Sequence, residues 1–114
     1  MAEEIFRNVP REKPAAAIDL VDFQEGQVVS RSLVQNTAVS ITMFAFDHGE
    51  GLSAHTTPGE AMALVLDGAA EITVGDETTR VSSGEIRVLP ANIPHAVHAP
   101  TRMKMLLTLV KKSD

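Results

Sequence analysis

The chain of 114 residues is long enough for one globular domain and too short for two domains of ordinary size. Its 15 acidic and 10 basic side chains give a net charge of −5, which disfavours binding to the phosphate backbone of nucleic acids. The sequence contains no cysteine, which excludes disulfides and thiolate metal sites, so metal or redox chemistry would need histidine, carboxylates or a bound cofactor.

The first 26 residues have the character of an arm rather than of a domain. Pro10 and Pro14 interrupt this segment, and its few apolar residues are too sparse to form a core. Residues 15–21 are compatible with a short helical turn, and Glu25-Gly26 reads as a break before regular structure begins. We therefore predict an N-terminal arm at residues 1–26 and a single domain at residues 27–114.

The remainder of the chain has the pattern of an all-β protein. Short runs rich in Val, Ile, Thr, Leu and Phe alternate with Gly, Pro, Asn and Asp, and Gly75-Asp76 is typical of a tight hairpin. This spacing favours a β-sandwich or closed barrel. The eight predicted strands are 28–33, 39–46, 61–66, 70–74, 78–81, 85–89, 95–98 and 103–110.

Two of these strands are apolar on both faces. In the second strand, Ile41, Met43 and Ala45 alternate with Phe44 and Phe46, and the last strand shows the same pattern. Because one face of an antiparallel sheet is normally solvated, the second apolar face needs a cover. We expect a homodimer formed through these outer strands and the arm. The alternative is a monomer in which the arm alone covers the face.

No stretch approaches the roughly 18 consecutive apolar residues that a membrane helix needs. Residues 1–4 are acidic and do not resemble the basic start of a secretory leader. We therefore expect a cytoplasmic protein with neither a membrane nor a nucleic acid as its partner.

Two histidine-containing segments carry a resemblance to a known family. The segment from Gly49 to Gly68 resembles the pattern G-x5-H-x-H-x3,4-E-x6-G, which it matches at Gly49, His55 and Gly68. The segment from Gly84 to Ala99 resembles G-x5-P-x-G-x2-H-x3-N, which it matches at Gly84, Pro90 and His95. These are the two motifs of the cupin superfamily, which the chain resembles over close to half its length. The resemblance implies an all-β, cupin-type double-stranded jelly-roll β-barrel, in the form of the small single-domain cupin-2 proteins of bacteria.

The departures from the motifs concern the metal ligands. In cupins that hold a metal, the resemblance implies three histidines and one glutamate, but here Thr57 stands for the second histidine and Ala61 for the glutamate. Glu60 lies one residue early, and it reaches the interior only if a bulge shifts the register of its strand. We accordingly expect a degenerate site of His55, His95 and Glu60 for one divalent ion of zinc, iron, manganese or nickel.

The other two histidines are expected outside this site. His98 follows His95 by three residues and so faces outward in an extended strand, and His48 reads as a loop residue.

The small side chains at Ala61 and Ala63 are expected to leave room for a small molecule inside the barrel. The alternative is that Met and Leu side chains fill the interior. The ligand-binding residues that we expect are Met43, His55, Thr57, Glu60, Ala63 and His95, with Ala45, Val65 and Val97 completing the lining.

These observations lead to one functional hypothesis and two alternatives. The hypothesis is a small-molecule-binding protein of unassigned activity with a degenerate metal site. The first alternative is a metal-dependent dioxygenase, isomerase or decarboxylase that acts on a small organic substrate; an outward-pointing Glu60 would count against it. The second alternative is a non-catalytic structural or sensor module.

Overall fold

The computed structural model describes residues 4–111, which form nine strands and one turn of 3-10 helix. All eight predicted strands are present, so the all-β prediction is confirmed. The additional strand, at residues 51–55, carries His55 and is absent from the predicted set. The elements are η1 (Ala17–Leu20), β1 (Val28–Gln35), β2 (Val39–Phe46), β3 (Gly51–His55), β4 (Glu60–Asp67), β5 (Ala69–Val74), β6 (Glu77–Ser82), β7 (Ile86–Leu89), β8 (His95–His98) and β9 (Met103–Val110).

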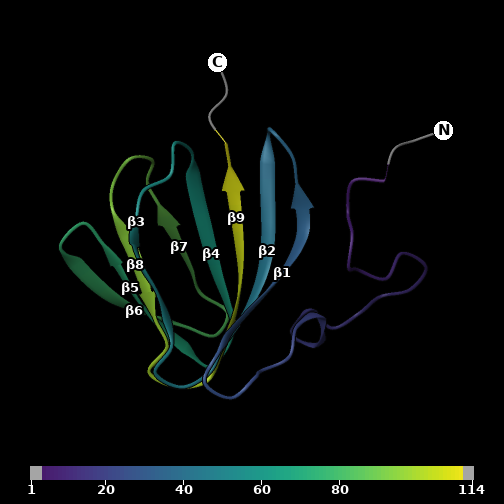
Figure 1. Cartoon of the computed structure of the whole chain (residues 1–114), viewed down its shortest axis with the longest axis horizontal. Coiled ribbons are helices and arrows are strands. Elements are labelled where there is room, and N and C mark those ends of the chain that lie inside the picture. The colour runs from purple at the N-terminus through teal and green to yellow at the C-terminus, as the bar shows by residue number, and fades with distance from the viewer. Residues whose placement is uncertain (1–3, 112–114) are drawn as a thin grey trace.

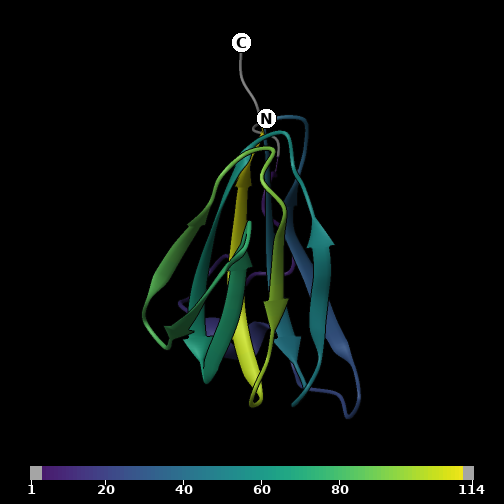
Figure 2. The same cartoon turned by 90° about the vertical axis from the view of Figure 1, so that its left-hand side faces the viewer.

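The strands form two antiparallel sheets that pack face to face. The larger sheet has the order β1-β2-β9-β4-β7, and the smaller sheet has the order β3-β8-β5-β6. Figure 1 shows the small sheet beside the large one, and Figure 2 looks onto the small sheet with the large sheet behind it. Strands that follow one another in sequence often lie in different sheets, as in a jelly roll. The fold is therefore the cupin-type barrel that the motifs implied.

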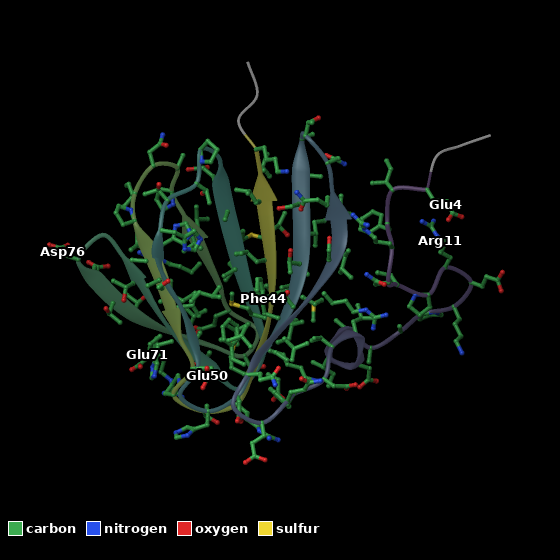
Figure 3. The ribbon with its side chains drawn as sticks, in the orientation of Figure 1. Glu4, Arg11, Phe44, Glu50, Glu71 and Asp76 are labelled. Carbon is green, nitrogen blue, oxygen red and sulfur yellow. The ribbon has the colours of Figure 1, made fainter. Side chains whose placement is uncertain are left out.

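The space between the sheets is filled by apolar side chains. Phe46 pairs in register with Met103, and Phe44 pairs with Met105, so that all four side chains enter the same core. Figure 3 shows Phe44 near the centre of the barrel. Phe46, Met103 and Met105 have no exposed surface. Large side chains thus fill the interior around Phe46. This agrees with the alternative prediction that methionine side chains occupy the inside of the barrel.

A second apolar cluster lies on the outer face of the large sheet, beneath the arm. There Met43 and Ala45 pack with Val21, and Leu20 and Phe23 of the arm are partly buried against the same cluster. Met43 and Ala45 were expected to line the interior, and this expectation is wrong. Alternation places them opposite Phe44 and Phe46, and those larger rings occupy the interior.

Hydrogen bonds hold the arm in place at several points along its length. The Arg7 backbone N–H donates to the Leu33 carbonyl oxygen at 2.9 Å, and Lys104 Nζ donates to the Ile18 carbonyl oxygen at 2.6 Å. The Lys104 ammonium also lies 4.9 Å from the centre of the Phe23 ring, a cation–π distance. The arm therefore covers one part of the outer apolar face within a single chain. Residues 1–3 and 112–114 of the two predicted ranges lie outside the described residues.

Asp47 joins the base of the arm to the start of β9. Its Oδ2 accepts a hydrogen bond from the Gly26 backbone N–H at 2.6 Å, and its Oδ1 accepts one from Arg102 Nε at 2.9 Å. The Gly26 N–H first and the Arg102 guanidinium second lower the pKa of Asp47 from 3.8 to about 2. Both contacts favour the charged carboxylate.

We expect Asp47 to make the stability of the protein depend on pH in acid. Because the pKa of Asp47 is lower in the folded chain, its contribution is complete above about pH 4 and is lost as the pH falls towards 2. Acid titrations followed by circular dichroism should show the Asp47→Asn variant less stable than the wild type at neutral pH, with a difference that shrinks across this interval. A difference that stays constant between pH 4 and 2 would contradict the assignment.

Candidate functional site

Two imidazoles meet at one end of the barrel, which we call the mouth. The mouth is the end where β3 and β7 terminate and β4 and β8 begin. His55 closes β3, His95 opens β8, and the two residues are direct partners in the antiparallel pairing of these strands. Their ring centroids are 4.4 Å apart, with an angle of 66° between the ring planes. The structure therefore brings together two residues that stand 40 positions apart in the sequence.

The two imidazoles have different surroundings. His95 is only 2% exposed, and its Nδ1 is buried without a hydrogen-bond partner among the described residues. His55 is exposed, and its Nδ1 lies 3.0 Å from the Ser53 carbonyl oxygen. Burial first, and the nearby His55 second, lower the pKa of His95 below 6.5, against a smaller opposing effect of the Ile93 carbonyl. His95 is therefore a neutral imidazole near pH 7.

Thr57 and Ala61 occupy the positions at which the motif has a histidine and a glutamate. The Thr57 hydroxyl is half-buried and donates to the Gly59 carbonyl oxygen at 2.9 Å, so it is engaged in a local turn. Ala61 and Ala63 face the interior and are 3% and 0% exposed. Leu89, which pairs with Ala61 in register, lines the same end of the barrel. The inward-facing residues of β4 and of the end of β7 are thus apolar at this end of the barrel.

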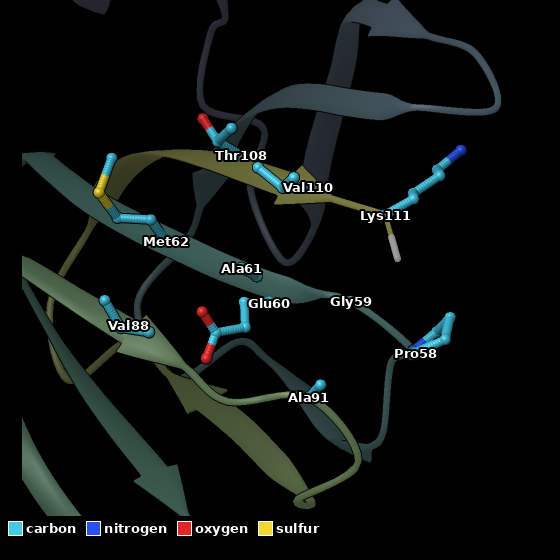
Figure 4. A pocket seen from close by; sticks show the side chains of 10 residues that line it. All are labelled: Pro58, Gly59, Glu60, Ala61, Met62, Val88, Ala91, Thr108, Val110 and Lys111. Atoms are coloured by element: carbon cyan, nitrogen blue, oxygen red, sulfur yellow. The ribbon is translucent and has the colours of Figure 1, made fainter. Parts of the chain in front are cut away.

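Glu60 lies on the opposite face of β4 from Ala61, so the bulge that would have brought it inside is not formed. It pairs in register with Val110, which is 59% exposed. Figure 4 shows its side chain in a pocket on the outer face, together with Val88 and Val110. The expected ligand set of His55, His95 and Glu60 is therefore wrong in its carboxylate. The strand keeps its alternation from Glu60 to Val65, and the odd offset from Ala61 sends Glu60 outward.

The donors at the mouth do not suit a resident metal ion. Within residues 4–111, no three side chains of His, Cys, Asp or Glu converge in a way that could hold one. Protein sites for zinc or iron usually have three or four protein ligands. Here two imidazoles are present, the Thr57 hydroxyl is engaged with Gly59, and alanine replaces the carboxylate. The site has kept the place of the cupin metal centre without its full set of ligands.

The other histidines lie where the sequence placed them. His98 is exposed on the outer face of β8, where its Nδ1 is 2.8 Å from Glu71 Oε1, and His48 is exposed in the turn after β2. On β7, Arg87 pairs in register with the inward-facing Ala63, and its Nε is buried. The inward side of β7 was not evident because its apolar residues Ile86 and Val88 lie on the exposed face.

The fold and the mouth define a small all-β barrel with a pair of histidines at its open end. The cupin domain model matches residues 42–110, which cover all strands from β3 to β9 and most of β2. The chain belongs to the cupin family. Within the described part, residues 4–111, there is no helix with the length and apolar character needed to cross a membrane.

Solved structures of similar sequence extend over the arm as well as the barrel. A conserved protein of unknown function from Streptococcus pyogenes, SPY1581, is 38% identical, with a TM-score of 0.95 and complete coverage of both chains. A cupin superfamily protein from Desulfitobacterium hafniense, DSY2733, is 32% identical with a TM-score of 0.91, over 94% of this chain and 98% of that one.

A curated relative is also uncharacterised. The protein SCO3923 of Streptomyces coelicolor is 35% identical over 60 residues, which are 53% of this chain and 57% of that protein. The match therefore spans little more than half the length of the curated relative. These similarities define the family and leave the activity to be argued from the site.

Proposed function

We propose that this cupin binds a small polar organic molecule at the mouth of its barrel, through the imidazoles of His55 and His95 and without a resident metal ion. The observation that carries the proposal is the imidazole pair, in which the ring centroids are 4.4 Å apart and the buried Nδ1 of His95 has no hydrogen-bond partner within residues 4–111. A buried polar atom without a partner costs about 1–3 kcal/mol. Such a cost is tolerated where a site serves a ligand.

The surroundings of the pair favour a neutral ligand over an anionic one. Because its pKa is lowered, His95 carries no charge near pH 7 and offers one N–H donor and one nitrogen acceptor. Ala61, Ala63 and Leu89 face the interior from the strands of the opposite sheet and suit an apolar part of the same molecule. A hydroxyl or amide group joined to a short hydrocarbon skeleton matches both features. Ala63 and Thr57 were expected to contact the ligand, and both keep this role in the proposal. Ala63 forms part of the interior wall, and Thr57 lies at the rim of the mouth.

We expect His95→Ala to weaken ligand binding at least about tenfold, because one hydrogen bond to a buried partner is worth about 1.4 kcal/mol. The control is His98→Ala, since His98 lies on the same strand but faces outward and is exposed. Each protein is purified without chelators and incubated with a metabolite extract. Native mass spectrometry then measures bound small molecules, and elemental analysis measures transition metals.

The two readouts separate the proposal from its rivals. Bound ligand that is lost in His95→Ala and kept in His98→Ala, with metal well below one equivalent in all samples, supports the proposal. About one equivalent of a transition metal that disappears in His95→Ala would overturn the metal-free site and favour a metal-dependent enzyme. Equal binding in both variants would remove His95 from the site.

A further inference from the structure

A polar crevice lies where the edges of the two sheets face each other. β6 is an edge strand of the small sheet and β7 is an edge strand of the large sheet (Figure 1), and residues 83–85 join them. The crevice between them, which we call the edge crevice, has a volume of about 240 Å³. It is lined by Thr79, Arg80, Val81, Glu85, Ile86 and Arg87. None of these residues belongs to the loops at the mouth, so the edge crevice is separate from the histidine pair.

Thr79 faces the edge crevice from the small sheet. It is the register partner of Ile72, which points into the core without exposed surface, so the Thr79 side chain also points inward. Its Oγ1 is buried and has no hydrogen-bond partner within residues 4–111. A hydroxyl can both donate and accept a hydrogen bond. Thr79 therefore presents an unpaired polar group to the crevice.

Arg87 faces the edge crevice from the large sheet. It pairs in register with the fully buried Ala63, and its Nε is buried without a hydrogen-bond partner in the described part of the chain. The three ion pairs among residues 4–111 involve Arg11, His98 and Arg102 instead. A guanidinium is always charged and can only donate hydrogen bonds. Arg87 is thus a cation that lies partly inside the barrel and has no carboxylate beside it.

The two unpaired groups belong to one place in the fold. Among residues 4–111, four buried polar side-chain atoms lack a partner, and two of them are Thr79 Oγ1 and Arg87 Nε. Buried polar groups in proteins are nearly always hydrogen-bonded, so each exception needs an explanation. The occurrence of two exceptions in the lining of the same crevice indicates that a ligand supplies the missing partner.

The turn at the end of the edge crevice is fixed by hydrogen bonds. The Gly84 N–H donates to the Val65 carbonyl oxygen at 2.7 Å, and the Val65 N–H donates to the Glu85 carbonyl oxygen at 3.1 Å. Glu85 Oε1 accepts a hydrogen bond from the Ser82 backbone N–H at 2.8 Å. The carboxylate in the lining is therefore engaged with the backbone and leaves Arg87 unpaired. Because the turn is already ordered, a ligand pays little entropy to organise it.

The charge and size of the edge crevice define the class of ligand. Arg80 and Glu85 are both exposed and carry opposite charges, which leaves the single positive charge of Arg87. Val81 and Ile86 add apolar surface to the lining. A volume of about 240 Å³ lies below the roughly 300–1,000 Å³ of pockets for drug-sized molecules. These features suit a small anion with one charge and a short hydrocarbon part.

We propose that the edge crevice binds a small monocarboxylate, whose oxygens accept hydrogen bonds from Arg87 Nε–H and from the Thr79 hydroxyl. A guanidinium offers parallel N–H groups that match the two oxygens of a carboxylate, and such charge-assisted hydrogen bonds are the strong ones. A dianion such as sulfate exceeds the single positive charge of the site. The proposal does not depend on the ligand proposed for the mouth.

The test uses butyrate as the probe and butyramide as its uncharged analogue. Each is titrated into the full-length chain at constant pH and ionic strength, and proton–nitrogen correlation spectra follow the backbone amides and the arginine Nε–H groups. Butyrate should shift the Arg87 Nε–H and the Thr79 amide in a saturable manner, and butyramide should not. This measurement needs no variant. Absence of a saturable shift, an equal response to butyramide, or shifts confined to His55 and His95 would overturn the proposal.

Matched variants test the two groups one at a time. Arg87→Lys keeps the charge but loses the planar fork, and it should raise the dissociation constant of butyrate at least about tenfold. Its control is Arg11→Lys, because Arg11 is exposed on the arm. Thr79→Val should raise the constant at least about threefold, whereas Thr78→Val, on the exposed face of the same strand, should leave it unchanged. The spectra show whether each variant is folded.

Two further outcomes separate this site from other kinds of binding. Equal weakening by Arg87→Lys and Arg11→Lys would indicate a general effect of charge and would overturn the proposal. His95→Ala should leave butyrate binding intact, since His95 lies at the mouth and not in the edge crevice. Loss of butyrate binding in His95→Ala would place the carboxylate at the mouth and contradict the edge crevice.

Discussion

Gly68→Ala is expected to lower the free energy of unfolding by about 3 kcal/mol. Gly68 connects β4 to β5 with a φ of +74°, a left-handed conformation that costs a residue with a side chain about 1 kcal/mol. A Cβ at this position would also overlap the carbonyl oxygen of Arg102. The backbone before β9 must move to relieve the overlap, which adds about 2 kcal/mol. The turn between the two sheets therefore requires glycine for two separate reasons.

Gly84→Ala is the matched control for this prediction. Gly84 has a φ of +87°, but nothing lies within 4 Å of the place that a Cβ would occupy. The control therefore keeps the conformational cost of about 1 kcal/mol and lacks the overlap. Urea unfolding of both variants and of the wild type, at one protein concentration, measures the difference. Equal losses of stability in the two variants would contradict the close approach of Gly68 to the Arg102 backbone.

Phe46→Ala is expected to cost about 4 kcal/mol, the largest loss that we predict for a single substitution. The Phe46 ring is fully buried between the sheets, and its centroid lies 5.7 Å from that of Phe44 in a stacked arrangement. Removal of the ring leaves a cavity that Met103 and Ala99, both without exposed surface, have little freedom to fill. The loss of contacts and the cavity act in the same direction.

Phe6→Ala separates the effect of burial from that of the substitution itself. Phe6 is 51% exposed on the arm, where Glu4 and Arg11 also lie (Figure 3), and its removal should change the stability by no more than about 0.5 kcal/mol. Thermal and urea unfolding of the two variants give the comparison. A Phe46→Ala variant that loses less than about 1 kcal/mol would contradict the assignment of Phe46 to the barrel core.

The site shows how a cupin barrel can keep its architecture while its metal ligands change. His55 and His95 remain partners across β3 and β8, so the mouth keeps its shape. Thr57 and Ala61 occupy two of the four metal-ligand positions of the cupin motifs, and Glu60 does not replace the missing carboxylate. What remains is a barrel mouth with one exposed imidazole and one buried, neutral imidazole. Such a pair suits recognition by hydrogen bonds, which is the basis of the proposed function.

The class of the fold and the positions of the two histidines follow from the sequence. Short β-rich runs and their turns predict strands because local residue preferences suffice for this, and the two-residue connection of β5 and β6 was found at Gly75-Asp76. The motif spacing located His55 and His95 at corresponding ends of two strands. Strand β3 was missed since it is short, begins with glycine and is mostly exposed, so its alternation carries little hydrophobic signal.

Which face of each strand points into the barrel depends on contacts between distant parts of the chain. In β2, Met43 and Phe44 point to opposite faces, and both are apolar, so alternation alone cannot say which of them lines the barrel. The arm supplies a second core for Met43, and this contact joins segments far apart in the chain. The side of Glu60 depended likewise on whether β4 has a bulge near its first residues. The pairing with β9 is regular from Glu60 to Val65, and the register shift of β4 lies at its other end, between Val65 and Asp67. Such long-range pairings are set by the packing of whole sheets, and no local pattern encodes them.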